Sequence, residues 1–350
     1  KNFKFNSRIN DGYMLLEYTI NHFNETRLKV DISFKGKEIY SKTLDVNNFY
    51  NRARIYLPKD GIHKWSVEEP NLYDVKFTLL KEDIVQDEIL TYFGINDVST
   101  KDGHVYLNNI DTYFKLILDQ GYYPETFYTG SEEEYIKDIS LMKEMGFNGC
   151  RKHEKIETPL FYYLCDTMGF LLWQELPSAH RYSYQVITSS KKEIFNQIND
   201  FYNCPSIVSY VIFNESWGIN EIKTNKEEQD GSVALYNFVK GIVPKGKFVI
   251  SNDGWEHTKS DLITLHNYGE TYESIFNLYQ DSFSKIKNGQ NAKANLDRDI
   301  FADGYQYNNE PLMLTEFGGI AYDKDSSKGW GYGNTVKNED AYIDKLSGLM

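Results

Sequence analysis

Polar residues that can carry or transfer a proton follow several short apolar runs in the C-terminal two thirds of the chain. They are Arg151 and His153 after FNGC, Glu175 after LLWQ, Asn214 and Glu215 after YVIF, His266 after LITL, and Glu316 after LMLT. In a barrel of parallel strands the carboxyl ends meet at one face, and catalytic groups gather there. A purely structural barrel has no reason to end apolar strands in Glu repeatedly. We therefore expect these side chains to meet at one mouth.

Two of these acids suit the cleavage of a glycosidic bond. One carboxyl group protonates the leaving oxygen, while the other attacks the anomeric carbon or activates water. Glu215 ends the fourth strand of the series and Glu316 the seventh, so the two should face each other across the mouth. That placement suits the separation of about 5–5.5 Å found in retaining enzymes. The sequence therefore predicts Glu215 as the acid/base and Glu316 as the nucleophile, and an inverting hydrolase on the same pair stays open.

The elements that must position these residues fall into two regions. Residues 1–100 hold about seven short runs rich in β-branched and aromatic residues, separated by Gly, Asn and Pro, which is typical of an immunoglobulin-like β-sandwich. Across residues 101–350, apolar strand runs alternate with helix patterns, which indicates a parallel α/β architecture. We expect an immunoglobulin-like domain in the first region and a catalytic (β/α)8 TIM-type barrel in the second.

Local signals support the helices and strands of the second region. Ser131 and Glu134 have the spacing of a capping box, and Thr158 precedes Pro159 as a helix start. The run 207–213 is almost wholly apolar, as in a strand buried on both faces. About seven strands can be counted from residue 113, and no eighth is visible before residue 350. The barrel is therefore expected either to hide one strand or to stop short of closure.

Composition excludes several classes of protein. A formal net charge of −13 argues against a nucleic acid or anionic membrane partner, and no apolar run is long enough for a transmembrane helix. Three cysteines give no disulfide framework and favour a reducing, cytoplasmic location, with secretion open because no initiator Met opens the chain. No metal and no cofactor are expected, because carboxylate-pair hydrolysis needs neither and no HExxH spacing appears. The aromatic content of 15% suits sugar stacking, with simple compositional bias as the alternative.

Several motifs together resemble glycoside hydrolase family 2, the β-galactosidase and β-glucuronidase-like enzymes. FNGCRKHEKIETPLFYYLCDTMGFLLWQELPSA resembles the second and third barrel strands of that family. CPSIVSYVIFNESWG resembles its acid/base motif, in which an Asn-Glu pair ends strand four, and PLMLTEFGG resembles its nucleophile motif at strand seven. IHKWSVEEPNLYDVKFTL is similar to the closing strands of the immunoglobulin-like domain that precedes the barrel. The resemblance covers roughly residues 60–320.

The resemblance implies roles for individual residues at the strand ends. Glu215 is the implied proton donor and Glu316 the implied nucleophile. Asn214 is the implied hydrogen-bond donor to the sugar 2-hydroxyl. Arg151 and His153 match positions in the barrel floor and the substrate rim, and Arg151 can equally hold the nucleophile ionised by its charge. The implied reaction is hydrolysis of a terminal β-linked sugar in an oligosaccharide or glycoside.

Four further residues are candidates for substrate binding. Tyr268 matches a tyrosine after strand six that hydrogen-bonds the nucleophile in related enzymes. His266 is expected to line the sugar pocket, with a place in the core as the alternative. Trp217 can stack on a sugar or pack within its loop. Glu175 is expected to reach a sugar hydroxyl.

Departures from the family pattern keep a second class of function open. The family normally begins with a jelly-roll sugar-binding domain, and no such domain is visible in this sequence. The eighth barrel strand is also not visible, and the first strand, YFKLILDQGYYP, differs from the more common wording. The alternative to an enzyme is therefore a carbohydrate-binding or scaffold fragment that is inactive alone. The sugar and the oligomeric state stay open.

Overall fold

The computed structural model describes residues 2–8, 11–21, 25–324 and 330–350. Antiparallel strands occupy the N-terminal region and form two sheets. One sheet contains β1 (Phe3–Arg8), β2 (Tyr13–Thr19) and β5 (Tyr50–Ile55) in the order β1-β2-β5. The other contains β3 (Thr26–Phe34), β4 (Lys37–Val46), β6 (Tyr73–Lys81) and β7 (Ile84–Phe93) in the order β4-β3-β6-β7. The strands alternate buried and exposed positions, as a half-buried sheet requires.

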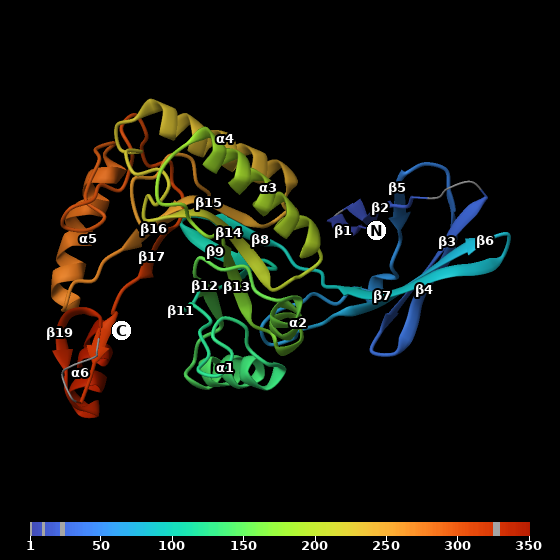
Figure 1. Cartoon of the computed structure of the whole chain (residues 1–350), viewed down its shortest axis with the longest axis horizontal. Helices are drawn as coiled ribbons and strands as arrows, with labels where there is room; N and C mark the ends of the chain where they lie inside the picture. The colour runs from blue at the N-terminus through green and yellow to red at the C-terminus, as the bar shows by residue number, and fades with distance from the viewer. Residues whose placement is uncertain (1, 9–10, 22–24, 325–329) are drawn as a thin grey trace.

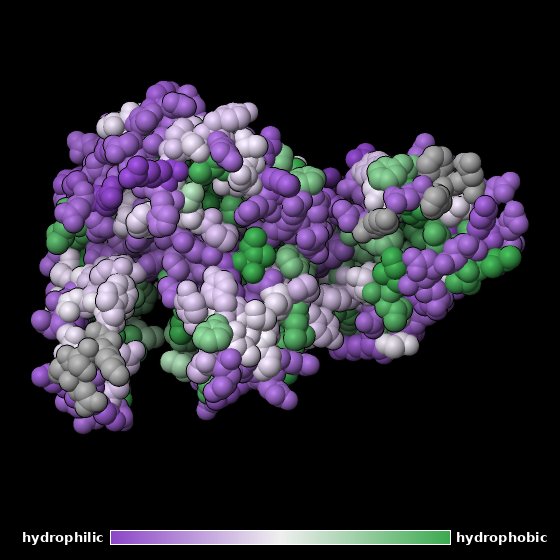
Figure 2. Space-filling model, in the orientation of Figure 1, coloured by the Kyte–Doolittle hydropathy of each residue, from purple (hydrophilic) through white to green (hydrophobic). Residues whose placement is uncertain are grey.

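The two sheets share one hydrophobic core, which includes Phe5, Leu16, Val30, Phe77 and Phe93. This arrangement agrees with the predicted immunoglobulin-like domain. The unit forms one end of an elongated molecule, to the right in Figure 1. Hydrophobic atoms remain on its surface along the β6–β7 edge in Figure 2, where Ile84 and Leu90 are exposed.

A small antiparallel sheet that the sequence did not predict follows the sandwich. It consists of β8 (Val98–Lys101), β9 (His104–Leu107) and β10 (Ile110–Asp111) in the order β10-β9-β8. Val105 and Leu107 pack with Trp173 in a cluster on one face of the following parallel sheet. These strands lie across the boundary predicted near residue 100, and that boundary stays a prediction.

Seven parallel strands follow in two sheets. The larger sheet contains β11 (Leu116–Asp119), β12 (Gly149–Lys152), β13 (Leu171–Glu175), β14 (Ile207–Asn214) and β15 (Phe248–Asp253), hydrogen-bonded in chain order. The smaller sheet pairs β16 (Ile263–His266) with β17 (Leu312–Glu316). Every residue of β12 to β16 is buried, because both faces of these strands are covered.

Helices separate most of these strands, as predicted. They are α1 (Glu132–Glu144), α2 (Pro159–Met168), α3 (Tyr184–Asp200), α4 (Lys226–Ile242) and α5 (Tyr272–Lys287). The capping box of Ser131 and Glu134 is present at the start of α1. Thr158 precedes α2 as predicted, but its side chain makes no capping hydrogen bond. α2 ends at Gly169 with φ 68°, and a Cβ there would lie 2.3 Å from the carbonyl oxygen of Val67, so glycine permits the close approach of the segment that follows the sandwich.

A closed eight-stranded barrel is not confirmed. Among the described strands, no ladder joins β15 to β16 or β17 to β11, and the seven parallel strands are not followed by an eighth of the same series. The chain continues through a separate pair, β18 (Ile320–Tyr322) and β19 (Tyr332–Val336), and then α6 (Glu339–Leu349). The surface is notched between the lobe that carries β19 and α6 and the lobe that carries α1 (Figures 1 and 2). None of the described helices is long and apolar enough to cross a membrane.

Candidate active site

Six successive parallel strands bring polar side chains to their carboxyl ends. The residues are Arg151 on β12, Glu175 on β13, Asn214 on β14, Asp253 on β15, His266 on β16 and Glu316 on β17. Because the strands are parallel, these ends lie at one edge of the structure, where ligands bind in α/β folds. Glu215 follows Asn214 directly, and His153 lies just beyond β12. The structure therefore brings the predicted strand-end residues together.

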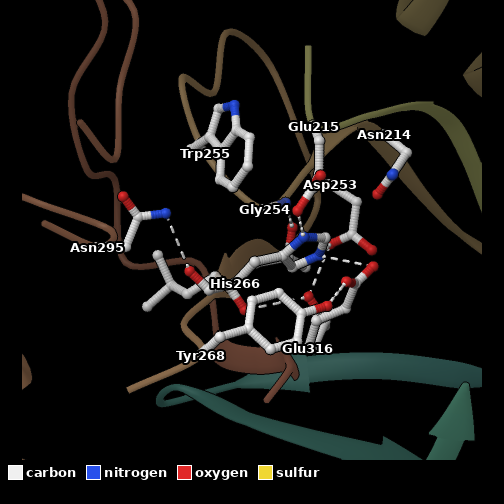
Figure 3. A network of polar contacts seen from close by, with 12 residues as sticks. Asn214, Glu215, Asp253, Gly254, Trp255, His266, Tyr268, Asn295 and Glu316 are labelled. Carbon is white, nitrogen blue, oxygen red and sulfur yellow. Dashed lines mark hydrogen bonds and ion pairs between the residues drawn. The ribbon is translucent and has the colours of Figure 1, made fainter. Parts of the chain in front are cut away.

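The two predicted catalytic acids approach each other closely. One oxygen of Glu215, one oxygen of Glu316 and one nitrogen of His266 all lie within 4.8 Å of one another (Figure 3). The side chain of Glu316 is 7% exposed and that of Glu215 is 21% exposed. One acid is therefore almost enclosed, while the other keeps a surface toward solvent. This difference separates the surroundings of two chemically identical groups.

Arg151 is the charged centre of the site. Its Nη2 lies 2.6 Å from Oε1 of Glu316, 2.9 Å from Oδ1 of Asn214 and 3.2 Å from Oε1 of Glu175. Its Nε lies 3.0 Å from Oδ2 of Asp253. Burial alone would lower the pKa of Arg151, but the charges of Asp253, Glu175 and Glu316 raise that pKa above its ordinary range. The guanidinium is therefore a fixed positive charge that orients three strand-end side chains.

The surroundings of Glu316 favour its ionised form. Burial would raise the pKa of Glu316, but the positive charges of Arg151 and His266 and a hydrogen bond from Tyr268 lower it overall. The Tyr268 hydroxyl donates to Oε2 of Glu316. Burial and the negative charge of Glu316 in turn raise the pKa of Tyr268, so this phenol keeps its proton. A carboxylate that is ionised, oriented and almost dry is suited to nucleophilic attack.

His266 lies between the two acids and has no exposed surface. Its Nδ1 is 2.9 Å from Oε1 of Glu215, and its Nε2 is 3.5 Å from Oε1 of Glu316. Burial would lower the pKa of His266, but the charge of Asp253 and the contacts with Glu215 and Glu316 raise it from 6.5 to about 9. At neutral pH both ring nitrogens therefore carry protons. The expectation that His266 lines the sugar pocket is wrong, because the ring is enclosed between charged neighbours.

Asp253 is a functional residue that the sequence analysis missed. It has no exposed surface, and its Oδ1 lies 3.5 Å from Nε2 of His266. Burial would raise the pKa of Asp253, but Arg151 and His266 hold it well below its usual range. The hydroxyl of Thr315 also donates to Asp253. Its position at the end of β15 was the available signal, and the same strand-end rule that selected the other residues would have selected it.

Glu175 supports the site from beneath rather than facing a ligand. Its side chain is fully buried, and its Oε2 accepts from the backbone N–H of Glu154 and lies 2.8 Å from Nδ1 of His153. Its Oε1 contacts Arg151. The expectation that Glu175 reaches a sugar hydroxyl is therefore wrong, because both oxygens are engaged inside the protein. Burial would lower the pKa of His153, but Glu175 raises it, and this imidazole stays partly exposed at the rim.

The backbone turns sharply at the predicted acid/base. Glu215 and Ser216 have φ values of 50° and 59°, a conformation uncommon for residues other than glycine. The N–H of Glu215 donates to the carbonyl of Asp253, and the N–H of Ser216 donates to Oδ1 of Asn252. The Ser216 hydroxyl donates to Glu256 at 2.8 Å. Sequence reasoning missed this supporting set, which holds a strained turn at the site.

A cavity of about 610 Å³ opens beside Glu215. Trp217, Trp255, Tyr268 and Tyr332 contribute to its lining. Trp217 is 44% exposed, so the structure places this predicted sugar-stacking residue on an accessible wall. The volume lies within the range of roughly 300–1,000 Å³ that is common for small-molecule sites.

Glu215, His266 and Glu316 also have the spacing of a metal-binding triad. Their surroundings do not fit that use. Arg151 lies 2.6 Å from the Glu316 oxygen that faces His266, so a cation already neutralises this carboxylate. An imidazolium has no lone pair to give a metal, and the pKa of His266 is raised to about 9.

Two buried or half-buried carboxylates that meet at the carboxyl ends of parallel strands define the class of protein, a glycoside hydrolase. The family model named glycosyl hydrolases family 2 matches residues 1–95. A protein from Formosa agariphila is 29% identical over 232 residues, which cover 62% of this chain and 27% of that protein. A β-galactosidase from Leuconostoc mesenteroides is 27% identical over 222 residues, which cover 61% of this chain and 20% of that enzyme.

Solved structures share the fold of the whole chain. The β-glucuronidase from Ruminococcus gnavus in complex with D-glucuronic acid superposes with a TM-score of 0.76 at 17% identity, covering 99% of this chain and 57% of that one. The predicted resemblance to glycoside hydrolase family 2 is therefore confirmed. The chain spans between 18% and 27% of the length of the first three curated relatives that it matches. What it catalyses is accordingly a proposal.

Proposed function

We propose that the protein is a retaining β-glycosidase in which Glu316 is the nucleophile and Glu215 the acid/base. The observation that carries this proposal is the approach of their carboxylate oxygens to within 4.8 Å. Retaining enzymes hold the two carboxyl groups about 5–5.5 Å apart, whereas inverting enzymes need roughly 6.5–9.5 Å to admit a water molecule. The short approach favours direct attack by one carboxylate over attack by an interposed water.

The scaffold of this proposal is a (β/α)8 barrel to which β11–β17 contribute seven strands. The chain order of the five-stranded sheet, the parallel pairing of β16 with β17, and the helices between most strands support it. The strand ends at which Glu215 and Glu316 lie would then face each other across the barrel mouth. The domain division near residue 100 belongs to the same proposal.

In the first step, an oxygen of the ionised Glu316 attacks the anomeric carbon. Glu215 gives its proton to the leaving oxygen as the bond between the anomeric carbon and that oxygen breaks. The product is a glycosyl ester on Glu316 and a free alcohol or phenol. Tyr268 and Arg151 hold the nucleophile in one orientation, which reduces the entropy lost on reaching the transition state.

In the second step, Glu215 acts as a base and takes a proton from a water molecule. The water oxygen attacks the anomeric carbon from the face that the leaving group vacated, and the ester bond to Glu316 breaks. Two inversions at one carbon give net retention. Between the steps a negative charge moves from Glu316 to Glu215, and His266 contacts both oxygens. Its imidazolium therefore faces the charged acid in either state.

Asn214 is suited to hold a sugar hydroxyl. Its Oδ1 accepts from Arg151 at 2.9 Å, which directs the amide and leaves Nδ2 as the donor. Among the described residues none accepts a hydrogen bond from this Nδ2. A 2-hydroxyl beside the anomeric carbon is the expected acceptor. This assignment follows from the family resemblance together with the fixed orientation of the amide.

The test begins with aryl β-galactosides and aryl β-glucuronides, the two sugar classes that the names of the relatives suggest. We expect turnover of at least one class and complete loss of turnover in Glu316→Gln. A 2-deoxy-2-fluoro glycoside of the accepted sugar should leave one sugar on the peptide that contains Glu316, as measured by mass spectrometry. A sugar attached to another residue, or release of the inverted anomer, would contradict the assignment.

A second candidate function is carbohydrate binding without turnover. The short span of the chain relative to its curated relatives favours it. It predicts that a β-galactoside or β-glucuronide raises the thermal unfolding midpoint while no alcohol or phenol is released over days. Release of the aryl group by the parent chain, and not by Glu316→Gln, rejects it.

A further inference from the structure

We infer that the cavity beside Glu215 is the site of the leaving group, and that it takes an uncharged ring such as a second sugar. The inference rests on the proposed function, because it assigns a side of the reaction to each carboxylate. The residues that line the cavity include Glu215 and Tyr268, but Glu316 and Arg151 are not among them. An acid/base touches the leaving oxygen, whereas the nucleophile lies on the opposite face of the anomeric carbon. A cavity that opens at the acid/base therefore lies where the departing group must go.

One wall of the cavity is held by the hydrogen bonds that fix the acid/base turn. The indole Nε1 of Trp255 donates to the Ser216 hydroxyl at 3.1 Å, and that hydroxyl donates to Glu256. The guanidinium of Arg298 lies over the Trp255 ring, 5.3 Å from its centroid, and contacts Glu256 at 3.2 Å. Trp255 is therefore fixed by a donor contact at its edge and by a cation on its face. The wall is pre-organised together with Glu215.

The rim of the cavity is held by a turn in the segment before β17. Nδ2 of Asn295 donates to the carbonyl of His266 at 3.3 Å, as Figure 3 shows. Oδ1 of Asn295 accepts from the backbone N–H groups of Asp297 and Arg298 at 3.0 and 2.9 Å. These bonds fix the turn, at whose tip the Leu296 side chain is 88% exposed. The rim is thereby attached to the strand end that carries His266.

The lining fits a ring with an apolar face and polar edges. Trp217 offers an accessible indole, and Tyr332 stacks on Tyr268 with 3.5 Å between ring centroids. The exposed amide of Asn220 lies in the same lining and can exchange hydrogen bonds with hydroxyl groups. Aromatic faces with a few polar groups at their edges are typical of sites that bind flat or ring-shaped ligands.

The charges of the lining argue against an anionic leaving group. Arg298 is the basic residue of the lining, and Glu256 already pairs with it at 3.2 Å. Asp297 and Glu215 add acidic groups to the same wall. A carboxylate or sulfate in the cavity would therefore meet uncompensated negative charge. An uncharged sugar or aryl group would not.

The experiment compares two substrates that share one sugar and differ in the leaving group. For galactose the pair is β-galactosyl fluoride and lactose, and for glucuronic acid it is β-glucuronyl fluoride and an aryl β-glucuronide. Fluoride is too small to reach the Trp217 wall and needs little proton donation. We expect Trp217→Ala to lower kcat/KM for the substrate with the large leaving group by about tenfold, a stacking contribution of about 1.4 kcal/mol. The loss for the fluoride should be at least fivefold smaller.

A second readout uses the same cavity in the reverse direction. An acceptor sugar bound there presents a hydroxyl to the glycosyl ester, Glu215 takes its proton, and the ester bond to Glu316 breaks as the new glycosidic bond forms. With β-galactosyl fluoride as donor and 0.5 M glucose as acceptor, about that concentration being typical for a weak site, Trp217→Ala should lower the ratio of transfer to hydrolysis several-fold. Asn220→Ala is the second variant and should lower the same ratio.

Tyr56→Ala is the matched control, because it removes a 60% exposed aromatic side chain from the sandwich. It should change neither the substrate comparison nor the transfer ratio. If the parent chain hydrolyses neither member of either pair, the proposed function fails. If the parent hydrolyses both members, but Trp217→Ala and Asn220→Ala lower both equally or leave the transfer ratio unchanged, the proposed function survives and the assignment of the cavity is overturned.

Discussion

The imidazole Nδ1 of His266 lies 2.9 Å from Oε1 of Glu215, in a position from which the other ring nitrogen reaches the side of Glu316. Every charged group around the ring comes from a different strand end: Glu215 after β14, Asp253 on β15, Glu316 on β17 and Arg151 on β12. Buried His257, whose pKa is lowered to about 4 by burial, is a neutral neighbour. The ring thus couples the two acids electrostatically without touching solvent.

Replacement of His266 should change the alkaline side of the pH profile. Its folded-state pKa of about 9 lies above the ordinary 6.5, so the contribution of the imidazolium is complete below pH 6.5 and is lost as pH rises through 9. We expect kcat/KM of the parent to fall near pH 9. His266→Gln keeps a neutral donor and should lose activity about 10- to 100-fold at neutral pH, because a hydrogen bond to a charged group contributes about 1.5–3 kcal/mol.

The matched control for this variant is His104→Gln, which alters an exposed imidazole paired with Asp111 on β9. It should reproduce the parental profile. An unchanged alkaline limb in His266→Gln would show that another group controls the activity at high pH. Unfolding midpoints of both variants at pH 7 separate a loss of folding from a change in chemistry.

Asp253 is expected to act through His266. Its carboxylate is the largest of the charges that raise the pKa of His266. Asp253→Asn should therefore move the alkaline limb of kcat/KM toward lower pH. The same substitution in a His266→Gln background should move no limb, because the titrating ring is absent. A shift of equal size in both backgrounds would assign the effect to Arg151, the other partner of Asp253.

The strand-end positions could be predicted from the sequence because they depend on local pattern. A short apolar run that stops at a polar residue identifies both the strand and its end, and this pattern located Arg151, Asn214, Glu215, His266 and Glu316. Burial of a charged residue is not a local property. Glu175 looks the same in the sequence whether it faces a sugar or a guanidinium, and only the packing of β12 against β13 decides the matter.

Other features escaped prediction for related reasons. Asp253 ends a short run, FVISN, whose polar residues hide the strand end. The turn at Glu215 and Ser216 has no glycine, so nothing in the sequence announces its positive φ values. Closure of a barrel depends on ladders between strands far apart in the chain, and residue patterns do not encode these.

Tyr268 should control the acid side of the pH profile. Its hydroxyl donates to Glu316 and helps hold the pKa of that carboxyl below the ordinary 4.5. Tyr268→Phe should raise the pKa of Glu316 and move the acid limb of kcat/KM to higher pH, with a loss of activity of about tenfold at the optimum. Tyr236→Phe removes a comparable phenol–carboxylate bond, to Asp261, away from the site and should leave the limb in place. An acid limb that stays put in Tyr268→Phe would contradict the hydrogen bond as its cause.

The junction between the sandwich and the parallel sheet should make stability depend on pH. Asp166 is fully buried there, where its carboxylate accepts from the hydroxyl of Tyr92 and the backbone N–H of Ser206, both at 2.8 Å. Burial raises the pKa of Asp166 from 3.8 to about 6 despite these donors. A raised pKa means that the stabilising contribution is complete below pH 3.8 and is lost as pH rises through 6. We therefore expect the difference in unfolding free energy between the parent and Asp166→Asn to change across that interval in urea titrations, with the parent losing stability relative to the variant as pH rises. A difference that is constant with pH would mean that Asp166 does not titrate there and that its two hydrogen bonds outweigh the cost of burying its charge.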